Sequence, residues 1–123
     1  MAIEHRRDGN VAVVTARGRY SMADLRDGVD EALDAFGEDV SAGLLFDLTG
    51  SESLGDRTAD DLRAMAIFLA SRGSRFSSRL AMVAVTDVAY GLMRMGAVTA
   101  ESQGIAAHVF RDYGSARRWL VPG

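Results

Sequence analysis

The stretch LLFDLTGSESLGDRTADDL, residues 44–62, decides the fold of this chain. The run at residues 43–48 is short and apolar, as the central strands of parallel sheets are, and we expect it to end on Asp47. A polar loop follows, and a helix is expected to begin at Thr58, with Asp61 three residues later in a capping-box position. A strand, a loop and a helix in this order are typical of α/β domains, which present binding groups where their strands end.

The composition is that of an ordinary globular domain. With 123 residues, of which 48% are hydrophobic and 25% charged, the chain has the size and balance of one soluble domain spanning residues 1–123. The absence of cysteine excludes disulfides, thiolate metal sites and thiol nucleophiles. A net charge of −3 argues against a nucleic-acid partner. No signal-peptide or membrane-spanning run is found, so we expect a cytoplasmic protein without stable membrane insertion.

The remaining predicted elements alternate along the chain. Residues 3–7 and 10–17 are expected to be strands joined by a tight hairpin at Asp8-Gly9. Apolar runs and helix caps then predict a helix between Ser21 and Gly37, a strand at residues 80–85, a helix between Asp87 and Gly104, a strand at residues 107–110, and a short helix from Asp112 to Leu120. The order β-β-α-β-α-β-α-β-α predicts an α/β fold with a mixed, mostly parallel sheet and helices packed on it.

This order resembles the STAS domain, the fold of bacterial anti-sigma-factor antagonists. The residues that carry the resemblance are Asp47-Leu48-Thr49-Gly50, the loop after them, and the helix that begins near residues 56–58. The C-terminal half is similar to a small bacterial STAS-like subfamily, related to CRAL-TRIO lipid-binding folds, in the segments Tyr90-Gly91-Leu92-Met93-Arg94-Met95, Val109-Phe110-Arg111-Asp112 and Ala116-Arg117-Arg118-Trp119-Leu120. The resemblance implies a STAS-like fold and a regulatory protein partner.

The chain departs from the antagonist pattern at the junction of loop and helix. Antagonists carry an Asp-Ser-Ser-Gly-like sequence there, and one serine accepts phosphate, whereas this chain reads Gly55-Asp56-Arg57-Thr58. Asp56 stands near the serine position and is no substrate for a serine kinase. We interpret Thr58 as a helix cap, and Ser51 and Ser53 as loop residues, with phosphate acceptance as the alternative for each.

The first functional hypothesis is a non-enzymatic interaction module that forms a homodimer and binds a regulatory protein. Its predicted recognition loop contains Asp47, Thr49, Ser53, Asp56, Arg57 and Thr58. Asp47 lies where parallel sheets expose functional groups, but hydrogen bonding to its own loop is the favoured interpretation. The helix that begins at Thr58 is apolar around much of its circumference at residues 65–69. We therefore expect the part of this helix that contains Phe68 to be covered by another chain or by neighbouring residues of this one.

The second hypothesis is a carrier of a small hydrophobic or lipid-like ligand. Met65, Met82, Met93 and Met95 are expected in the core or in an interface, and flexible thioethers also suit a ligand pocket. Such a pocket is predicted between the second and third helices, with Arg94 or Arg57 near an anionic head group. Tyr90 and Arg94, one helical turn apart, are candidate contacts for that group or for a partner carboxylate, with a surface stacking pair as the alternative.

An enzyme has the least support. Hydrolytic triads require a nucleophile, a base and an orienting acid, and the two histidines, His5 and His108, lie in separate predicted strands outside any motif. Their spacing matches no metal site. Asp60 and Asp61 point about 100° apart on a helix and do not form an acid/base pair. We therefore expect no catalytic residue, metal or cofactor.

Overall fold

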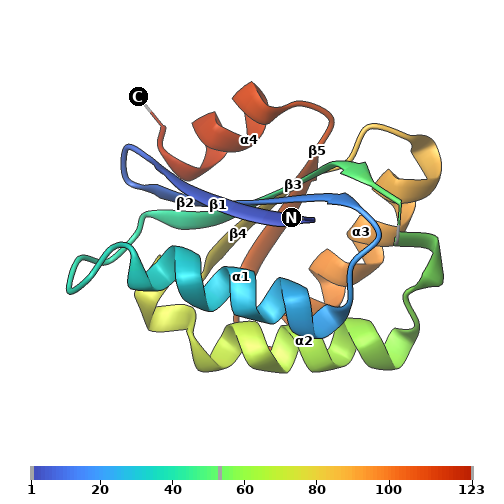
Figure 1. Ribbon diagram of the computed structural model, residues 1–123, viewed down its shortest axis with the longest axis horizontal. Helices are drawn as coiled ribbons and strands as arrows, with labels where there is room; N and C mark the ends of the chain where they lie inside the picture. Colours follow the sequence, from blue (N-terminus) through green and yellow to red (C-terminus); the bar gives the residue numbers. More distant parts are fainter. Residues whose placement is uncertain (1, 53, 123) are drawn as a thin grey trace.

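A computed structural model describes residues 2–52 and 54–122 of the chain as a five-stranded sheet covered by helices (Figure 1). The strands are β1 (Ile3–Asp8), β2 (Val11–Gly18), β3 (Gly43–Ser51), β4 (Arg79–Val83) and β5 (Ala106–Phe110). They lie in the order β1-β2-β3-β4-β5, with β1 antiparallel to β2 and every other pair parallel. The predicted α/β fold with a mixed, mostly parallel sheet is confirmed.

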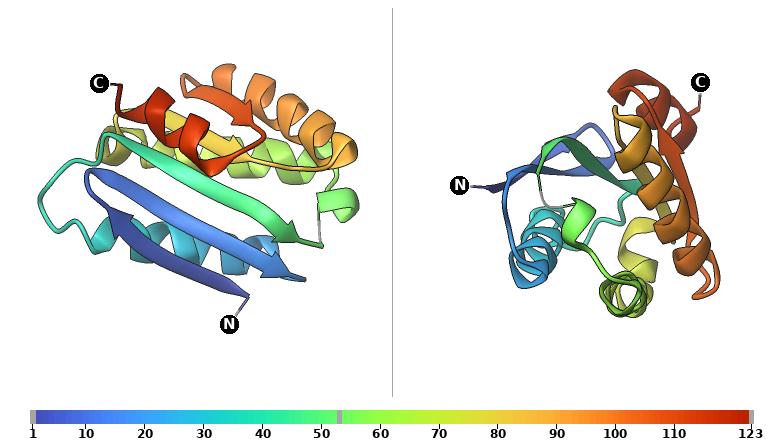
Figure 2. Two further views of the ribbon diagram at one scale, coloured as in Figure 1. Left: turned by 90° about the horizontal axis from the view of Figure 1, so that it is seen from above. Right: turned by 90° about the vertical axis from the view of Figure 1, so that its right-hand side faces the viewer.

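The helices divide unequally between the two faces of the sheet. They are α1 (Met22–Asp34), α2 (Ala59–Ser71), α3 (Asp87–Glu101) and α4 (Tyr113–Leu120), with short 3-10 turns η1 (Leu54–Asp56) and η2 (Gly73–Phe76). Crossovers between parallel strands are right-handed as a rule, and here each one moves to the next strand in the same direction. The three crossover helices α1, α2 and α3 therefore share one face, and α4 lies on the other (Figures 1 and 2).

Both faces of the three central strands are buried. Val14, Phe46 and Met82 lie side by side in the register and pack in the core beneath α1, α2 and α3. The residues before them, Val13, Leu45 and Ala81, point to the opposite face and pack against α4. A strand buried on both faces has no polar alternation, which is why residues 43–46 read as an uninterrupted apolar run.

The close packing of α4 requires a glycine at the start of β3. A Cβ atom at Gly43 would lie 2.3 Å from Cδ2 of Leu120, far inside the contact distance. Leu120 and Ala116 are both buried and attach the eight-residue helix to the sheet. Gly43 thus lets a short helix cover a face that the three longer helices leave open.

The predicted helix caps are confirmed where the signal is local. Ser21 and Asp24 form a capping box at α1, because the Ser21 hydroxyl accepts from the Asp24 N–H and the Asp24 carboxylate accepts from the Ser21 N–H. Thr58 and Asp61 form the same arrangement at α2. At α3 the prediction is wrong by one residue: Thr86, not Asp87, is the cap, and its hydroxyl accepts from the Ala89 N–H.

The predicted end of β3, the hairpin turn and the bounds of β4 are also wrong. Asp47 does not end β3, because β2 is longer than β4 and its Gly18 pairs with Ser51 beyond a bulge. The hairpin turn is Gly9-Asn10 rather than Asp8-Gly9, since Asp8 still pairs with Val11 and the positive φ of +59° falls at Gly9. The strand predicted at residues 80–85 spans Arg79–Val83.

A partly buried cluster of hydrogen bonds and an ion pair connects α4 to the first hairpin. The Asp8 carboxylate accepts hydrogen bonds from the Tyr113 hydroxyl and from Nε of Arg117, the latter at 3.1 Å. The Tyr113 hydrogen bond is the main cause that lowers the pKa of Asp8, and the neighbouring Arg117 adds to it. Burial, followed by the same hydrogen bond, raises the pKa of Tyr113.

This contact predicts a specific pH dependence of stability. A carboxyl group with a lowered pKa in the fold stabilises it above its usual pKa of 3.8, and this contribution is lost as the pH falls through the lower folded value. We expect Asp8→Asn to reduce the free energy of unfolding by about 0.5–1 kcal/mol at pH 7, and we expect this gap to narrow as the pH falls below the usual carboxyl pKa of 3.8. Urea denaturation at several pH values measures this gap, with Asp60→Asn as an exposed control. A gap of constant size from pH 7 to pH 3 would contradict the assignment.

Candidate functional site

The predicted recognition loop begins inside β3, which contains Asp47 and Thr49, and its later residues follow the strand at the carboxyl end of the sheet. Asp47 is the β3 residue that pairs with Thr15 on one side and with Val83 on the other. Its carboxylate accepts from the backbone N–H of Thr49 at 3.2 Å and from the Thr49 hydroxyl at 2.8 Å. Asp47 therefore braces the strand end, as the favoured interpretation has it. Ser53 lies outside the described residues.

Tyr20 connects the loop to the end of β2. Its hydroxyl lies 2.7 Å from Oγ of Ser51, and its carbonyl accepts from Nη2 of Arg57 at 2.8 Å. The Arg57 guanidinium also lies over the Tyr20 ring, 4.9 Å from its centroid. The loop is thus fastened near both of its ends to one buried aromatic residue.

Sequence reasoning missed Tyr20, although a local signal for it exists. Tyr20 directly precedes the α1 cap Ser21, and Leu25 occupies the fourth position of the helix. Apolar residues at these two positions form the hydrophobic staple that fixes how a chain enters a helix. Both side chains line the same cavity, described below.

The two polar residues at the junction of loop and helix have distinct roles. Asp56 lies in η1, where its exposed carboxylate accepts from Nη1 of Arg19 at 2.8 Å. The Thr58 hydroxyl accepts from the Asp61 N–H at 3.1 Å and so performs the capping role expected of it. The position near the antagonist's serine is therefore occupied by a carboxylate that is paired with Arg19.

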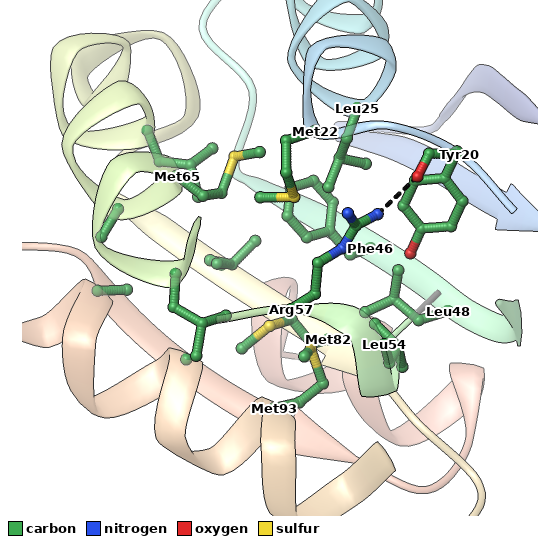
Figure 3. A pocket seen from close by; sticks show the side chains of 16 residues that line it. Tyr20, Met22, Leu25, Phe46, Leu48, Leu54, Arg57, Met65, Met82 and Met93 are labelled. Atoms are coloured by element: carbon green, nitrogen blue, oxygen red, sulfur yellow. Dashed lines mark hydrogen bonds between the residues drawn. The ribbon is translucent and has the colours of Figure 1, made fainter. Parts of the chain in front are cut away.

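A small apolar cavity lies behind the loop, between the sheet and the helices α1, α2 and α3 (Figure 3). It has a volume of about 60 Å³. Four methionines line it, namely Met22, Met65, Met82 and Met93, and Arg57 is the charged residue in its wall. The prediction placed the pocket between the second and third helices alone, but α1 and the sheet also form its wall. A cavity of about 150 Å³ admits benzene, so this one has no room for a lipid tail as it stands.

A comparison with solved structures identifies the fold. The crystal structure of an uncharacterized DUF3478-family protein with a SpoIIAA-like fold, from Shewanella loihica PV-4, aligns with a TM-score of 0.61. The alignment covers 97% of this chain and 92% of that chain, at 20% sequence identity. This chain has a SpoIIAA-like fold. The predicted STAS-like architecture is confirmed, while no protein-family model and no curated protein matches the chain.

The second group of predicted contact residues is dispersed over the SpoIIAA-like fold. The Tyr90 ring is covered by the guanidinium of Arg111, 4.2 Å from its centroid, and Arg111 also donates to the Val85 carbonyl. Arg94 is exposed on α3. Phe68 is half-buried against the core, and the guanidinium of Arg72 lies 4.3 Å from its ring centroid. These residues do not form one site with Met65, which lines the cavity.

Of the four methionines expected in the core or in an interface, Met95 lies outside the core. Met95 is 58% exposed on α3, while Met93, Ala97 and Ala100 form the buried face of that helix. Met95 is two residues from Met93, or about 200° around the helix, so it faces away from the core. Met95 is thus available to an interface.

The histidines stand at opposite edges of the sheet. Nε2 of His5, on β1, is 3.7 Å from the Glu31 carboxylate of α1. His108, on β5, packs its ring 4.9 Å from that of Phe110. Within residues 2–52 and 54–122, no cluster of three or more histidine or acidic side chains is arranged to hold a metal ion. No helix in the same ranges is long and apolar enough to cross a membrane.

The contacts of Arg57 predict that it stabilises the fold more than a neighbouring arginine does. Arg57 is half-buried and donates to a carbonyl while stacking on Tyr20, whereas Arg19 forms an exposed ion pair. We expect Arg57→Ala to reduce the free energy of unfolding by about 1–2 kcal/mol, and Arg19→Ala to reduce it by less than about 0.5 kcal/mol. Urea denaturation of both variants tests this ranking, and equal losses would contradict it.

Proposed function

We propose that this chain is a non-enzymatic protein-interaction module that binds a regulatory protein through the carboxyl end of its sheet. The observation that carries the proposal is a groove of about 150 Å³ between η1 and the start of α3. Val88 lines this groove and is 72% exposed, and Val85 beside it is exposed as well. Exposed branched side chains next to a groove at the binding end of an α/β sheet favour an apolar contact with a partner.

The contacts beneath this surface support the proposal. We define the loop-end surface as Glu52, Gly55, Asp56, Val85 and Val88. The hydrogen bond between Tyr20 and Ser51 and the ion pair between Arg19 and Asp56 hold the loop in place before any partner arrives. A surface ordered in advance loses less conformational entropy on binding.

The chemistry of the loop-end surface indicates the kind of partner. Its groove is lined by apolar side chains together with the exposed acid Glu52, and the exposed Asp56 directly follows Gly55 of the groove wall. The complementary partner presents an apolar side chain flanked by basic residues. Because residue 56 is an aspartate and not a serine, binding at this position needs no phosphorylation of residue 56. The separation of His5 and His108 to opposite edges supports the non-enzymatic part of the proposal.

The loop-end surface can be tested by a pair of matched valine substitutions. Val88→Asp introduces a charge into the groove, while Val40→Asp changes a valine that is 54% exposed between α1 and β3, at the other end of the sheet. We expect wild type and Val40→Asp to capture the same protein from extracts of the source cells, and Val88→Asp to lose it. A photo-crosslinking residue at position 88 should attach to that protein. Undiminished capture by Val88→Asp would refute the proposed surface.

The cavity behind Arg57 supports a second candidate function, the binding of a small apolar ligand that carries an anionic group. Its four methionine side chains adapt readily in shape, so the space can grow beyond its present volume of about 60 Å³. The Arg57 guanidinium stands in the wall and offers the charge that would meet an anionic head group. In this function the ligand separates α2 from its neighbours as it enters.

Dodecanoate below its micelle-forming concentration is the probe for this second function. If the cavity opens, we expect dodecanoate to raise the melting temperature of wild type by about 2–4 °C. Met65→Trp fills the cavity and should abolish the shift, whereas Met95→Trp changes an exposed methionine and should preserve it. The absence of any shift in wild type, together with no co-purifying mass in native mass spectrometry, would exclude the carrier.

A further inference from the structure

Helix α3 presents an apolar stripe to solvent. Val98 is 69% exposed, and with the exposed Met95 and Gly91 it follows the three- and four-residue spacing of one helix face. We call Gly91, Met95 and Val98 the α3 stripe. A groove of about 330 Å³ runs beside it, lined by Ala59, Leu62 and Arg63 of α2 and by Met95, Val98 and Thr99 of α3. Figure 2 shows α3 as an outer helix of its layer, with α2 beside it.

Gly91 is a second feature of the stripe that the chain's own packing does not explain. A glycine inside a helix destabilises it by about 1 kcal/mol relative to alanine. A Cβ atom at Gly91 would meet nothing within 4 Å, whereas one at Gly96 would lie 3.7 Å from Leu62. Glycine on an open helix face lets another backbone approach closely.

Charges of opposite sign accompany the stripe along one side. Arg94 and Glu101 are both exposed, and they are seven residues, or about two turns, apart on the same side of α3. In the described part of the chain neither forms an ion pair. When two copies of α3 pack antiparallel about an axis between Ala97 and Val98, each Arg94 faces the Glu101 of the other copy. Such reciprocity is the mark of a two-fold symmetric interface.

We propose that the α3 stripe is the interface of a homodimer in which a second copy packs its α3 antiparallel on the first. In this register the two Val98 side chains meet at the two-fold axis, and each Met95 packs beside them. Gly91 then leaves room for the turn at residues 102–104 of the other copy, which follows α3. The groove beside α2 receives side chains from the second copy.

The charge pattern distinguishes a second copy from an unrelated helical peptide. A peptide needs no matched Arg94 and Glu101 at this spacing, whereas the two-fold arrangement uses both residues twice. The interface also differs from the one predicted around Phe68, whose ring is already covered by Arg72. Val88 lies beyond the contact in this register, so the homodimer leaves the loop-end surface free.

An introduced cysteine tests the register directly, because the natural chain contains none. We expect wild type to show twice the monomer mass of 13.2 kDa in light scattering at micromolar concentration. Under mild oxidation, Val98→Cys should form a disulfide-linked dimer. Ile67→Cys, at an exposed position of α2 outside the stripe, should stay monomeric on a non-reducing gel. A monomeric wild type, or equal crosslinking of both variants, would overturn the proposal.

Charge reversal of Arg94 and Glu101 provides a second test of the proposed homodimer. Arg94→Glu and Glu101→Arg should each weaken dimerisation about tenfold or more, and the double variant should return to within about threefold of wild type. Circular dichroism confirms that each variant is folded. Failure of the double variant to recover would rule out the antiparallel pairing and favour another occupant of the stripe. Val88→Asp should retain the wild-type dimer, which separates this result from the test of the loop-end surface.

Discussion

The right-handed crossover, repeated three times in one direction, is the constraint on which the rest of this structure depends. Because the strands follow one another across the sheet in chain order, α1, α2 and α3 all fall on the same face. That face receives the main core and the methionine-lined cavity. The opposite face is left to α4, which is eight residues long and reaches the sheet closely only because residue 43 is a glycine. The same progression leaves α3 at the outside of its layer, where its apolar stripe has no helix of its own chain to cover it.

The elements that the sequence predicts well are those whose signals are local. The capping boxes at Ser21 and Thr58 lie within four residues, and the buried strands show as apolar runs. The α3 cap and the hairpin turn were each missed by one residue although their contacts are local, whereas the other failures have partners far away in the chain. Asp47 does not end β3 because Gly18 of β2 continues the pairing. Tyr90 stacks with Arg111, the residue that follows β5 in the chain, instead of with Arg94.

The candidate site shows the same division between local and distant information. Asp47 hydrogen-bonds two residues ahead, and Thr58 caps three residues ahead, so both roles were within reach of sequence reasoning. Tyr20, by contrast, hydrogen-bonds to Ser51, 31 residues away in the chain, and to Arg57, 37 residues away. Such contacts depend on the strand order, which a hydrophobic pattern alone does not specify. The exposure of Met95 escaped prediction for a related reason: helical periodicity gives two neighbouring apolar faces on α3, and only the packed structure shows which of them is buried.

The contact between Asp8 and Tyr113 has a consequence for how the chain reaches its fold. These residues are 105 positions apart, and their contact fastens α4, the helix that covers the apolar face of β2, β3 and β4, to the first hairpin. During synthesis on the ribosome, that face stays open to water until residue 120 has emerged, long after the core beneath α1 and α2 can begin to assemble. Until α4 packs on the sheet, Val13, Leu45 and Ala81 lack the cover that this helix gives them. This is the stage at which a chaperone has a surface to bind and at which neighbouring chains are most prone to aggregate.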